Sequence, residues 1–279
     1  MTGDELRREI ESLAELADPP RARARSAVSA LLAALERGEV RAAEASPAGW
    51  VVHAWVKRGI VLAFRVGEDR DVDLPPVFHF RDRDTLPPRP DARGPGGARV
   101  VPGGTSIRRG AYVGRGVVVM PPAFVNVGAR VEEGTMIDSH ALVGSCAQIG
   151  RRVHLSAGAQ VGGVLEPIGA LPVIVEDDAF VGGGCGLFEG VRVGAGAVLA
   201  PGVVLTRSVP LYDLVRGEVL RAGAGESLAV PAGAVVVPGS RPATGAFAHR
   251  HGLQLQAPVV VKYRDAGTDA TLVLEQALR

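Results

Sequence analysis

Residues 106–161 read SIRRGAYVGRGVVVMPPAFVNVGARVEEGTMIDSHALVGSCAQIGRRVHLSAGAQV, and every sixth residue of this stretch is aliphatic. The series is Ile107, Val113, Val119, Val125, Val131, Ile137, Val143, Ile149, Leu155 and Val161, and a second series follows in a shifted frame: Val175, Val181, Leu187, Val193, Leu199 and Leu205. A helix repeats its apolar face every 3.6 residues and a strand alternates every two, so neither produces a period of six. The pattern therefore predicts a parallel β-helix with three hexapeptides in each triangular coil.

The positions that follow these aliphatic residues also repeat. The fourth residue after each one is mostly small or β-branched, as a narrow interior requires: Ala111, Val117, Ala123, Ala129, Thr135, Ala141, Ala147, Val153 and Ala159. The residue directly after the aliphatic is often Gly, Asn or Asp: Gly114, Asn126, Asp138, Gly144, Gly150, Gly162, Gly182 and Gly194. Because these residue types tolerate an unusual φ, we expect them to form the tight corners.

Composition and charge restrict the function classes. The 279 residues are 47% hydrophobic and 4% aromatic and include 37 glycines, which indicates a folded chain with a thin interior. The formal charge is +1 and no basic stripe with interleaved aromatic residues occurs, so no nucleic-acid partner is expected. Cys146 and Cys185 lack metal-ligand spacing, which predicts buried structural thiols and no metal site. We see no signal peptide and no apolar run of about 18 residues, which predicts a cytoplasmic protein without a membrane partner.

The residues before the repeat predict an α/β cap. Residues 2–17 and 20–38 carry helical spacing on either side of a break at two prolines. Residues 48–81 alternate and are rich in Val and aromatic residues, which predicts a small sheet or hairpin. Residues 83–98 contain four prolines and three glycines and are typical of a linker.

The repeat is interrupted once and then ends. The interval from Val161 to Val175 is two residues longer than two repeats, which predicts an extruded loop at residues 163–173. After residue 205 we expect strands and a final helix from about Asp269 to Leu278, which together close the open end of the coil. The fold class is mainly β: a left-handed parallel β-helix (96–209) with an N-terminal α/β domain (1–95) as a cap and a short C-terminal β/α tail (210–279).

Two motifs are more specific than the repeat. They are GTMIDSHALVGSCAQIG (134–150) and VHLSAGAQVGGVLEP (153–167). The chain here resembles the tetrahydrodipicolinate N-succinyltransferases, which are hexapeptide-repeat acyltransferases and usually read GTMVDTWATVGSCAQIG in the first motif. The resemblance extends to WVVHAWVKRGIVLAFR (50–65), RVVPGG (99–104), MPPAFVNVGARVEEGTM (120–136) and VPAGAVVVPGS (230–240), about four fifths of the chain.

The resemblance implies a reaction and a set of residues. The amine of ring-opened, hydrated tetrahydrodipicolinate would attack the thioester of succinyl-CoA, a cosubstrate rather than a permanently bound cofactor, in the diaminopimelate route to lysine. Asp138 matches the family's catalytic aspartate and would receive the ammonium proton, while Arg99 matches an arginine that binds a carboxylate of the substrate. The family also implies a homotrimer with its sites between subunits.

One departure from the family pattern concerns the second carboxylate. Where the family commonly reads IGARSEVVEG, this chain reads VGGGCGLFEG, so the glutamate usually paired with the aspartate falls on Gly186. Glu189 aligns with the following family glutamate and is our second candidate catalytic residue. Backbone amides at Gly183, Gly184 and Gly186 are an alternative source of oxyanion donors. Glu166, in the expected loop, is a weaker candidate of the same kind.

Several alternatives stay open. His140 or His154 would have the basicity of a general base, although surface and packing histidines are common on such coils. The transferred group could be acetyl instead of succinyl, or the acceptor a different amine. The lost glutamate also suits a non-catalytic scaffold. A metal-dependent trimer would need spaced histidines, and these two are 14 residues apart. No side-chain signature for CoA is present; Lys262 and Arg264 could meet its phosphates, but a charged strand edge explains them better.

Overall fold

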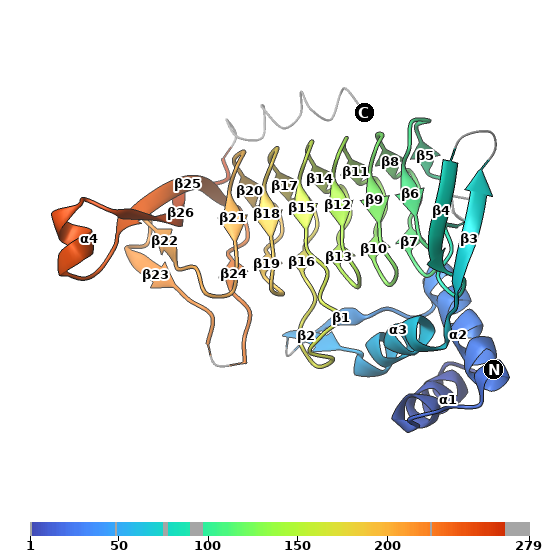
Figure 1. The fold of residues 1–279 in the computed structure, drawn as a ribbon. Helices are drawn as coiled ribbons and strands as arrows, with labels where there is room; N and C mark the ends of the chain where they lie inside the picture. Colours follow the sequence, from blue (N-terminus) through green and yellow to red (C-terminus); the bar gives the residue numbers. More distant parts are fainter. Residues whose placement is uncertain (1, 48, 75–77, 90–96, 224, 266–279) are drawn as a thin grey trace.

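The repeat folds into a three-sided solenoid. The computed structural model describes residues 2–47, 49–74, 78–89, 97–223 and 225–265. Two-residue strands stack in parallel into three faces, and the solenoid runs across the centre of the molecule (Figure 1). Along one face Met136 pairs with Val118 on one side and His154 on the other, so one coil takes 18 residues, or three hexapeptides. The predicted parallel β-helix with three repeats per coil is confirmed.

The three faces are named here in the order in which the chain visits them from residue 112. The first face contains β7 (Tyr112–Val113), β10 (Arg130–Val131), β13 (Gln148–Ile149), β16 (Ile174–Val175), β19 (Arg192–Val193) and β24 (Ala229–Val230). The second contains β5 (Arg99–Val100), β8 (Val118–Val119), β11 (Met136–Ile137), β14 (His154–Leu155), β17 (Phe180–Val181) and β20 (Val198–Leu199). The third contains β6 (Ser106–Ile107), β9 (Phe124–Val125), β12 (Leu142–Val143), β15 (Gln160–Val161), β18 (Gly186–Leu187) and β21 (Val204–Leu205).

The interior of the solenoid is the predicted one. All sixteen periodic aliphatic residues lie in one continuous core with exposures of 2% or less. The small residues four positions later are buried in the same core, and Thr135 donates its hydroxyl to the carbonyl of Gly150 at 2.8 Å. Because one aliphatic residue from each strand fills the axis, the core needs neither a disulfide nor a metal ion.

The corners differ from the prediction. The left-handed φ lies at the third residue after the aliphatic, not at the first, for example at Gly134 (φ 69°), His140 (φ 62°) and Cys146 (φ 65°). The first residue is small for another reason: a Cβ on Gly182 would lie 2.6 Å from the carbonyl oxygen of Leu199 in the next coil. The prediction named the right residue types but the wrong cause, because close stacking of coils also demands glycine.

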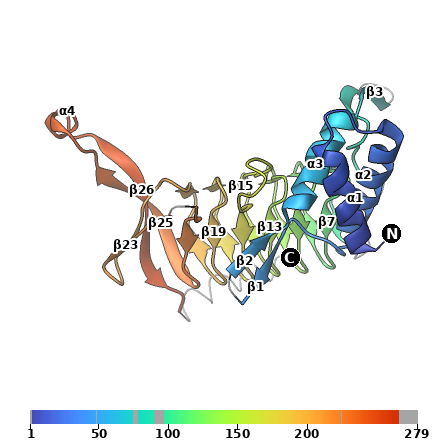
Figure 2. The ribbon, with the colours of Figure 1, turned by 90° about the horizontal axis from the view of Figure 1, so that it is seen from below.

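The N-terminal part is helical with two small hairpins. Helices α1 (Gly3–Glu15) and α2 (Arg21–Glu36) confirm the two predicted helices, and Thr2 caps the first with a capping box. A hairpin of β1 (Ala43–Ser46) and β2 (Gly49–Val52) follows, and β3 (Asp69–Leu74) pairs with β4 (Phe78–Arg83). Figure 2 shows β1 and β2 lying across the first face, near β13 and β19.

The prediction of a sheet throughout residues 48–81 is wrong in its middle. Residues Ala54–Val66 form helix α3, which packs against α1 and α2. Its buried residues Val56, Ile60 and Ala63 are four and three positions apart, so they share one helical face. The β-branched and aromatic residues suggested strands, but burial against two helices overrides that propensity.

Two segments leave the solenoid. Residues 162–173 connect β15 to β16 and reach α3, where the buried Lys57 ammonium donates to the carbonyl of Ala170 at 2.6 Å (Figure 1). Beyond the last coil, β22 (Leu211–Asp213) and β23 (Glu218–Leu220) form one hairpin. Strands β25 (Ala234–Pro242) and β26 (Gln254–Tyr263) form a longer one with helix α4 (Ala246–Arg250) at its tip.

Some predicted features fall partly or wholly beyond the described residues. The final helix at 269–278 lies outside them, as do residues 90–96 of the predicted linker. Within the rest of 83–98, Pro88 forms a bridge with Arg108. The three-part division of the chain stays a prediction. Among the described helices, none is long and apolar enough to cross a membrane.

Candidate active site

Asp138 lies at the corner that joins the second face to the third. It follows β11 directly and is half-buried, and its backbone N–H donates to Leu155 of the next coil at 2.9 Å. One carboxylate oxygen, Oδ1, accepts the backbone N–H of Ser139 at 2.7 Å. The other oxygen accepts no hydrogen bond from any described residue. The turn therefore fixes the orientation of the carboxylate and leaves one oxygen available for a proton.

The same corner in the next two coils carries small residues. Ser156 and Gly182 stand in register with Asp138 and are followed by Ala157 and Gly183. Neither Ala157 N–H nor Gly183 N–H finds an acceptor within the described part of the chain. By contrast, the N–H groups of Gly184 and Gly186 donate to Ala157 and Val203 at 2.9 Å each, so they are not available as oxyanion donors. Of the three glycine amides considered from the sequence, only that of Gly183 stays a candidate.

Arg99 lies on the same face as Asp138. It pairs with Val118, which pairs with Met136, so two strand spacings, or about 10 Å, separate its backbone from Met136. Its side chain is exposed and forms no ion pair with the described residues. The structure thus places an exposed guanidinium, without an ion pair among the described residues, and a positioned carboxylate along one face of the prism.

Glu189 lies at a different edge. It follows β18 by two residues, at the corner that joins the third face to the first. Its side chain is exposed, and Oε2 accepts the backbone N–H of Arg207 at 3.1 Å. Because a whole face separates the two corners, Glu189 and Asp138 do not meet within one chain. A shared site would require a second copy.

The position of the missing glutamate is filled by a neighbouring ring. A Cβ on Gly186 would lie 2.6 Å from Cε2 of Phe188, and a Cβ on Gly162 would lie 2.8 Å from Cδ1 of the same ring. The Phe188 ring therefore covers both glycines on the third face. At positions 186 and 188 the family reads Glu and Val, whereas this chain reads Gly and Phe.

The remaining candidates occupy structural positions. His140 is exposed at the left-handed position of the Asp138 corner, and the His154 ring packs on Phe180 with centroids 4.8 Å apart. Glu166 faces a hollow of about 300 Å³ shared with Arg58 and Arg65, away from Asp138. Lys262 pairs with Asp265 at 3.3 Å and Arg264 donates to the Asp178 carbonyl at 3.3 Å, which favours a structural role for both.

Both cysteines are buried in the protein interior. Cys146 and Cys185 are buried free thiols, as predicted. Burial raises the pKa of the Cys146 thiol to about 12, so it stays protonated and unreactive. No group of three or more His, Cys, Asp or Glu residues suitable for a metal ion occurs within the described ranges.

Sequence reasoning missed one buried charge. Lys57 is fully buried on α3, and burial lowers the pKa of its ammonium. It sits beside Cys146 and anchors the 162–173 segment through Ala170. The available signal was a lysine flanked by apolar residues in WVKRGIVL, where an amphipathic helix would place it on the apolar side.

Comparison with known proteins defines the class first. Residues 172–207 match the family model described as the hexapeptide repeat of succinyl-transferase, which agrees with the strand stacking and with the predicted left-handed β-helix. Residues 5–66 match the model described as the tetrahydrodipicolinate N-succinyltransferase N-terminal domain. The fold and both matches place the chain among the hexapeptide-repeat acyltransferases.

Curated relatives then identify the family within this class. Proteins named 2,3,4,5-tetrahydropyridine-2,6-dicarboxylate N-succinyltransferase are 41% identical in Idiomarina loihiensis (91% of this chain, 89% of the relative) and 43% identical in Polynucleobacter asymbioticus (91% and 90%). A third, from Bordetella petrii, is 44% identical (92% and 90%). The chain belongs to the tetrahydrodipicolinate N-succinyltransferase family.

A solved structure was also compared. It comes from Campylobacter jejuni and is described as a 2,3,4,5-tetrahydropyridine-2-carboxylate N-succinyltransferase. It is 15% identical, with a TM-score of 0.43 over 84% of this chain and 62% of that one. The fold of this chain is established by its own strand pairing.

Proposed function

We propose that this chain transfers the succinyl group of succinyl-CoA to the amine of ring-opened, hydrated tetrahydrodipicolinate, in the diaminopimelate route to lysine. The observation that carries the proposal is the Asp138 carboxylate: Oδ1 accepts the Ser139 amide at 2.7 Å, and the second oxygen accepts no hydrogen bond from the described residues. The chain is 41–44% identical to relatives named 2,3,4,5-tetrahydropyridine-2,6-dicarboxylate N-succinyltransferase. The assembly is a cytoplasmic homotrimer that binds the dicarboxylate and the acyl-CoA between subunits.

Each proposed residue has one task. Asp138 takes a proton from the substrate ammonium, and the free amine attacks the thioester carbonyl. The amide N–H groups of Ala157 and Gly183 stabilise the resulting oxyanion. The C–N bond forms, the C–S bond breaks, and the CoA thiolate leaves and is protonated. Arg99 binds a carboxylate of the substrate through its guanidinium.

Glu189 has a role in this scheme only across a subunit boundary. It would approach Asp138 from a neighbouring copy, because the two residues lie at different edges of one prism. In that position it would protonate the leaving thiolate or hold the attacking amine. The Glu189→Gln variant should lose turnover if Glu189 has either of these roles. Its turnover should be unchanged if Glu189 is only a surface residue.

The test is thiol release with succinyl-CoA and, in parallel, acetyl-CoA, using tetrahydrodipicolinate or L-2-aminopimelate as acceptor. We expect turnover with succinyl-CoA that falls at least about 100-fold in Asp138→Asn, the usual size of a general-base contribution. Glu133→Gln, an exposed carboxylate at another corner, is the matched control and keeps full activity. Full activity of Asp138→Asn contradicts the assignment of the base. A preference for acetyl-CoA moves the chain to acetyl transfer, and silence with both donors supports the scaffold alternative.

A further inference from the structure

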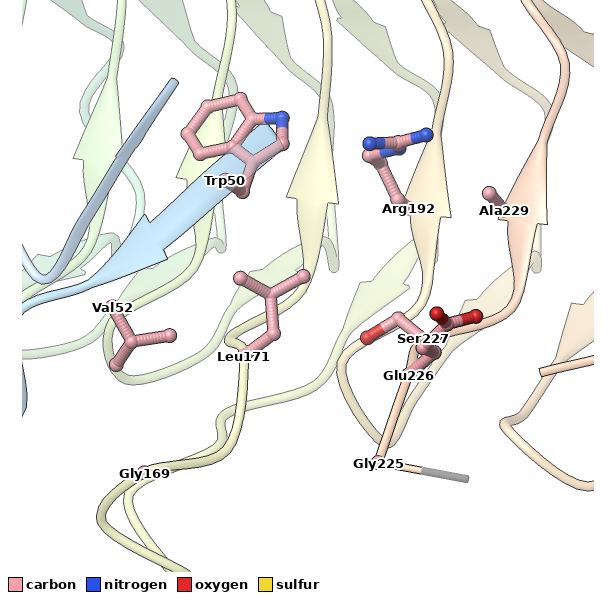
Figure 3. A pocket seen from close by; sticks show the side chains of 9 residues that line it. All are labelled: Trp50, Val52, Gly169, Leu171, Arg192, Gly225, Glu226, Ser227 and Ala229. Carbon is pink, nitrogen blue, oxygen red and sulfur yellow. The ribbon is translucent and has the colours of Figure 1, made fainter. Parts of the chain in front are cut away.

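A second hollow lies outside the proposed active site. It has a volume of about 430 Å³ and lies against the first face, where three distant parts of the chain meet. Trp50 and Val52 come from β2, and Gly169 and Leu171 from the 162–173 segment. The rest come from β19, from β24 and from the residues that lead into β24: Arg192, Gly225, Glu226, Ser227 and Ala229 (Figure 3). Pockets of about 300–1,000 Å³ are the usual size of small-molecule sites.

The hollow contains one cation and one anion that do not neutralise each other. Arg192 makes one ion pair among the described residues, a long one of 3.8 Å from Nε to Glu176, and its side chain is 39% exposed. Glu226 is exposed and forms no ion pair within the described ranges. Glu176 is already engaged, since it accepts from Trp50 Nε1 at 3.2 Å and from the Ala195 amide at 3.1 Å. Both charges are therefore available to a ligand.

The rest of the lining supplies an apolar wall and a hydroxyl. The bond to Glu176 holds the Trp50 indole in place, and Leu171 and Val52 lie on the same side of the hollow (Figure 3). The Ser227 hydroxyl makes no hydrogen bond with the described part of the chain. An indole held in place beside a partly exposed guanidinium gives a surface for both a carboxylate and an apolar side chain.

Charge balance decides the class of ligand. A simple anion would be attracted by Arg192 but repelled by Glu226 and Glu176. A simple cation would be attracted by the two carboxylates but repelled by Arg192. A zwitterion satisfies both charges. We propose that this hollow binds an α-amino acid, with its carboxylate on Arg192, its ammonium on Glu226 and its side chain against Trp50 and Leu171.

Such a ligand would contact three parts of the chain that are distant in sequence. Gly169 and Leu171 flank Ala170, whose carbonyl accepts the buried Lys57 ammonium of α3. A ligand between β2, the 162–173 segment and the first face adds a further link between the N-terminal part and the solenoid. Binding to the folded state alone raises the melting temperature with ligand concentration.

The test uses the full chain and the fluorescence of Trp50. L-Leucine is the probe, because it is neither proposed substrate, and calorimetry provides a second readout. We expect a saturable change in fluorescence that Trp50→Phe removes, since only Trp55 then remains. 4-Methylpentanoate and 3-methylbutylamine, which are leucine without its ammonium and without its carboxylate, should not bind.

Charge variants decide the outcome. Arg192→Gln and Glu226→Gln should each weaken leucine binding at least about tenfold, which is about 1.4 kcal/mol. Arg115→Gln, an exposed arginine outside the hollow, should leave it unchanged. The proposal is overturned if leucine, methionine and lysine all fail to bind at concentrations up to about 20 mM. A dissociation constant above that concentration is far weaker than a metabolite site requires. Equal binding of 4-methylpentanoate, or unchanged affinity in both charge variants, overturns it as well. None of these outcomes depends on succinyl transfer.

Discussion

Gly186 and Phe188 form a coupled pair at the residue scale. The ring of Phe188 occupies the space that a side chain at 186 would need, and it also covers Gly162. A side chain at 186 therefore requires either that the ring moves or that a smaller residue stands at 188, as in the Glu and Val of the family pattern. The ring at 188 and the glycine at 186 are therefore compatible, whereas the ring in its present position and a side chain at 186 are not.

We expect Gly186→Glu alone to destabilise the protein by about 1–3 kcal/mol, the usual cost of overpacking. Adding Phe188→Val should recover most of that loss, because it removes the ring that the new Cβ would contact. Urea unfolding of the two single variants and the double variant measures the coupling. Additive effects in this cycle would contradict the described contact. Turnover of the double variant then reports whether a restored carboxylate adds to catalysis.

His140 tests the competing assignment of the base. It adopts φ 62° at a position that is glycine in many of the other coils. We expect His140→Gly to relieve this strain, to raise the free energy of unfolding by about 0.5 kcal/mol, and to keep turnover unchanged. Steady-state kinetics and thermal unfolding measure both. A tenfold or larger loss of turnover at unchanged KM, about 1.4 kcal/mol, would favour an imidazole base instead.

At the element scale, ion pairs join the helices to the segments around them. Arg25 of α2 donates to both carboxylate oxygens of Asp84, at 3.0 and 2.7 Å, and the Glu68 amide adds a third hydrogen bond at 2.9 Å. The Asp84 side chain is only 8% exposed. The hydrogen bonds from Arg25, followed by the amide bond, lower the pKa of Asp84 to about 2. This pair fixes the end of the second hairpin against α2.

The sign of the pH effect follows from that shift. A carboxyl group whose pKa is lower in the folded state stabilises the fold above its unfolded pKa, about 3.9, and loses this contribution as pH falls through about 2. Because Arg25 is 36% exposed, we discount the pair to about 1 kcal/mol, which predicts that Asp84→Asn lowers Tm at pH 7 by about 2–4 °C. The difference from the unmodified chain should shrink between about pH 4 and pH 2. Asp71→Asn, which breaks the fully exposed pair with Arg81, should leave Tm unchanged, and a constant difference for Asp84→Asn at all pH values would refute the linkage.

At the scale of the whole molecule, exposed apolar side chains gather at one end. Of the ten large apolar residues found exposed in the described part of the chain, seven lie between residues 214 and 261, in the two C-terminal hairpins: Leu214, Val215, Val219, Phe247, Leu253, Leu255 and Val261. The longer hairpin projects away from the solenoid, with α4 at its tip (Figures 1 and 2). A concentration of exposed apolar side chains is typical of protein–protein interfaces.

We expect the proposed trimer to depend on this hairpin. Replacing Phe247, Leu253 and Leu255 together with Lys should shift the chain from trimer to monomer in sedimentation experiments, because three charges would be buried in an apolar contact. Leu16→Lys, an exposed leucine after α1, is the matched control and should stay trimeric. Turnover should fall with the trimer if the site lies between subunits. A triple variant that remains trimeric and active would show that the hairpin is not part of the interface.

The sequence by itself determined the repeating part of the protein. The six-residue period identified the residues of the core, the number of strands per coil and the interruption after Val161, because each coil repeats one local pattern. The motifs identified the family for the same reason: they are contiguous in the chain.

Tertiary structure decided everything that depends on contacts between distant segments. It made a helix of residues 54–66 by packing them on α1 and α2, and it attached the 162–173 segment to α3 through Lys57. It set Glu189 and Asp138 at different edges of the prism and placed the Phe188 ring over Gly186. The hollow around Trp50 and Arg192 has no sequence pattern at all, because its walls come from residues 50–52, 169–171 and 192–229. Local periodicity reports which side chains point inward, whereas packing between elements decides which of them meet.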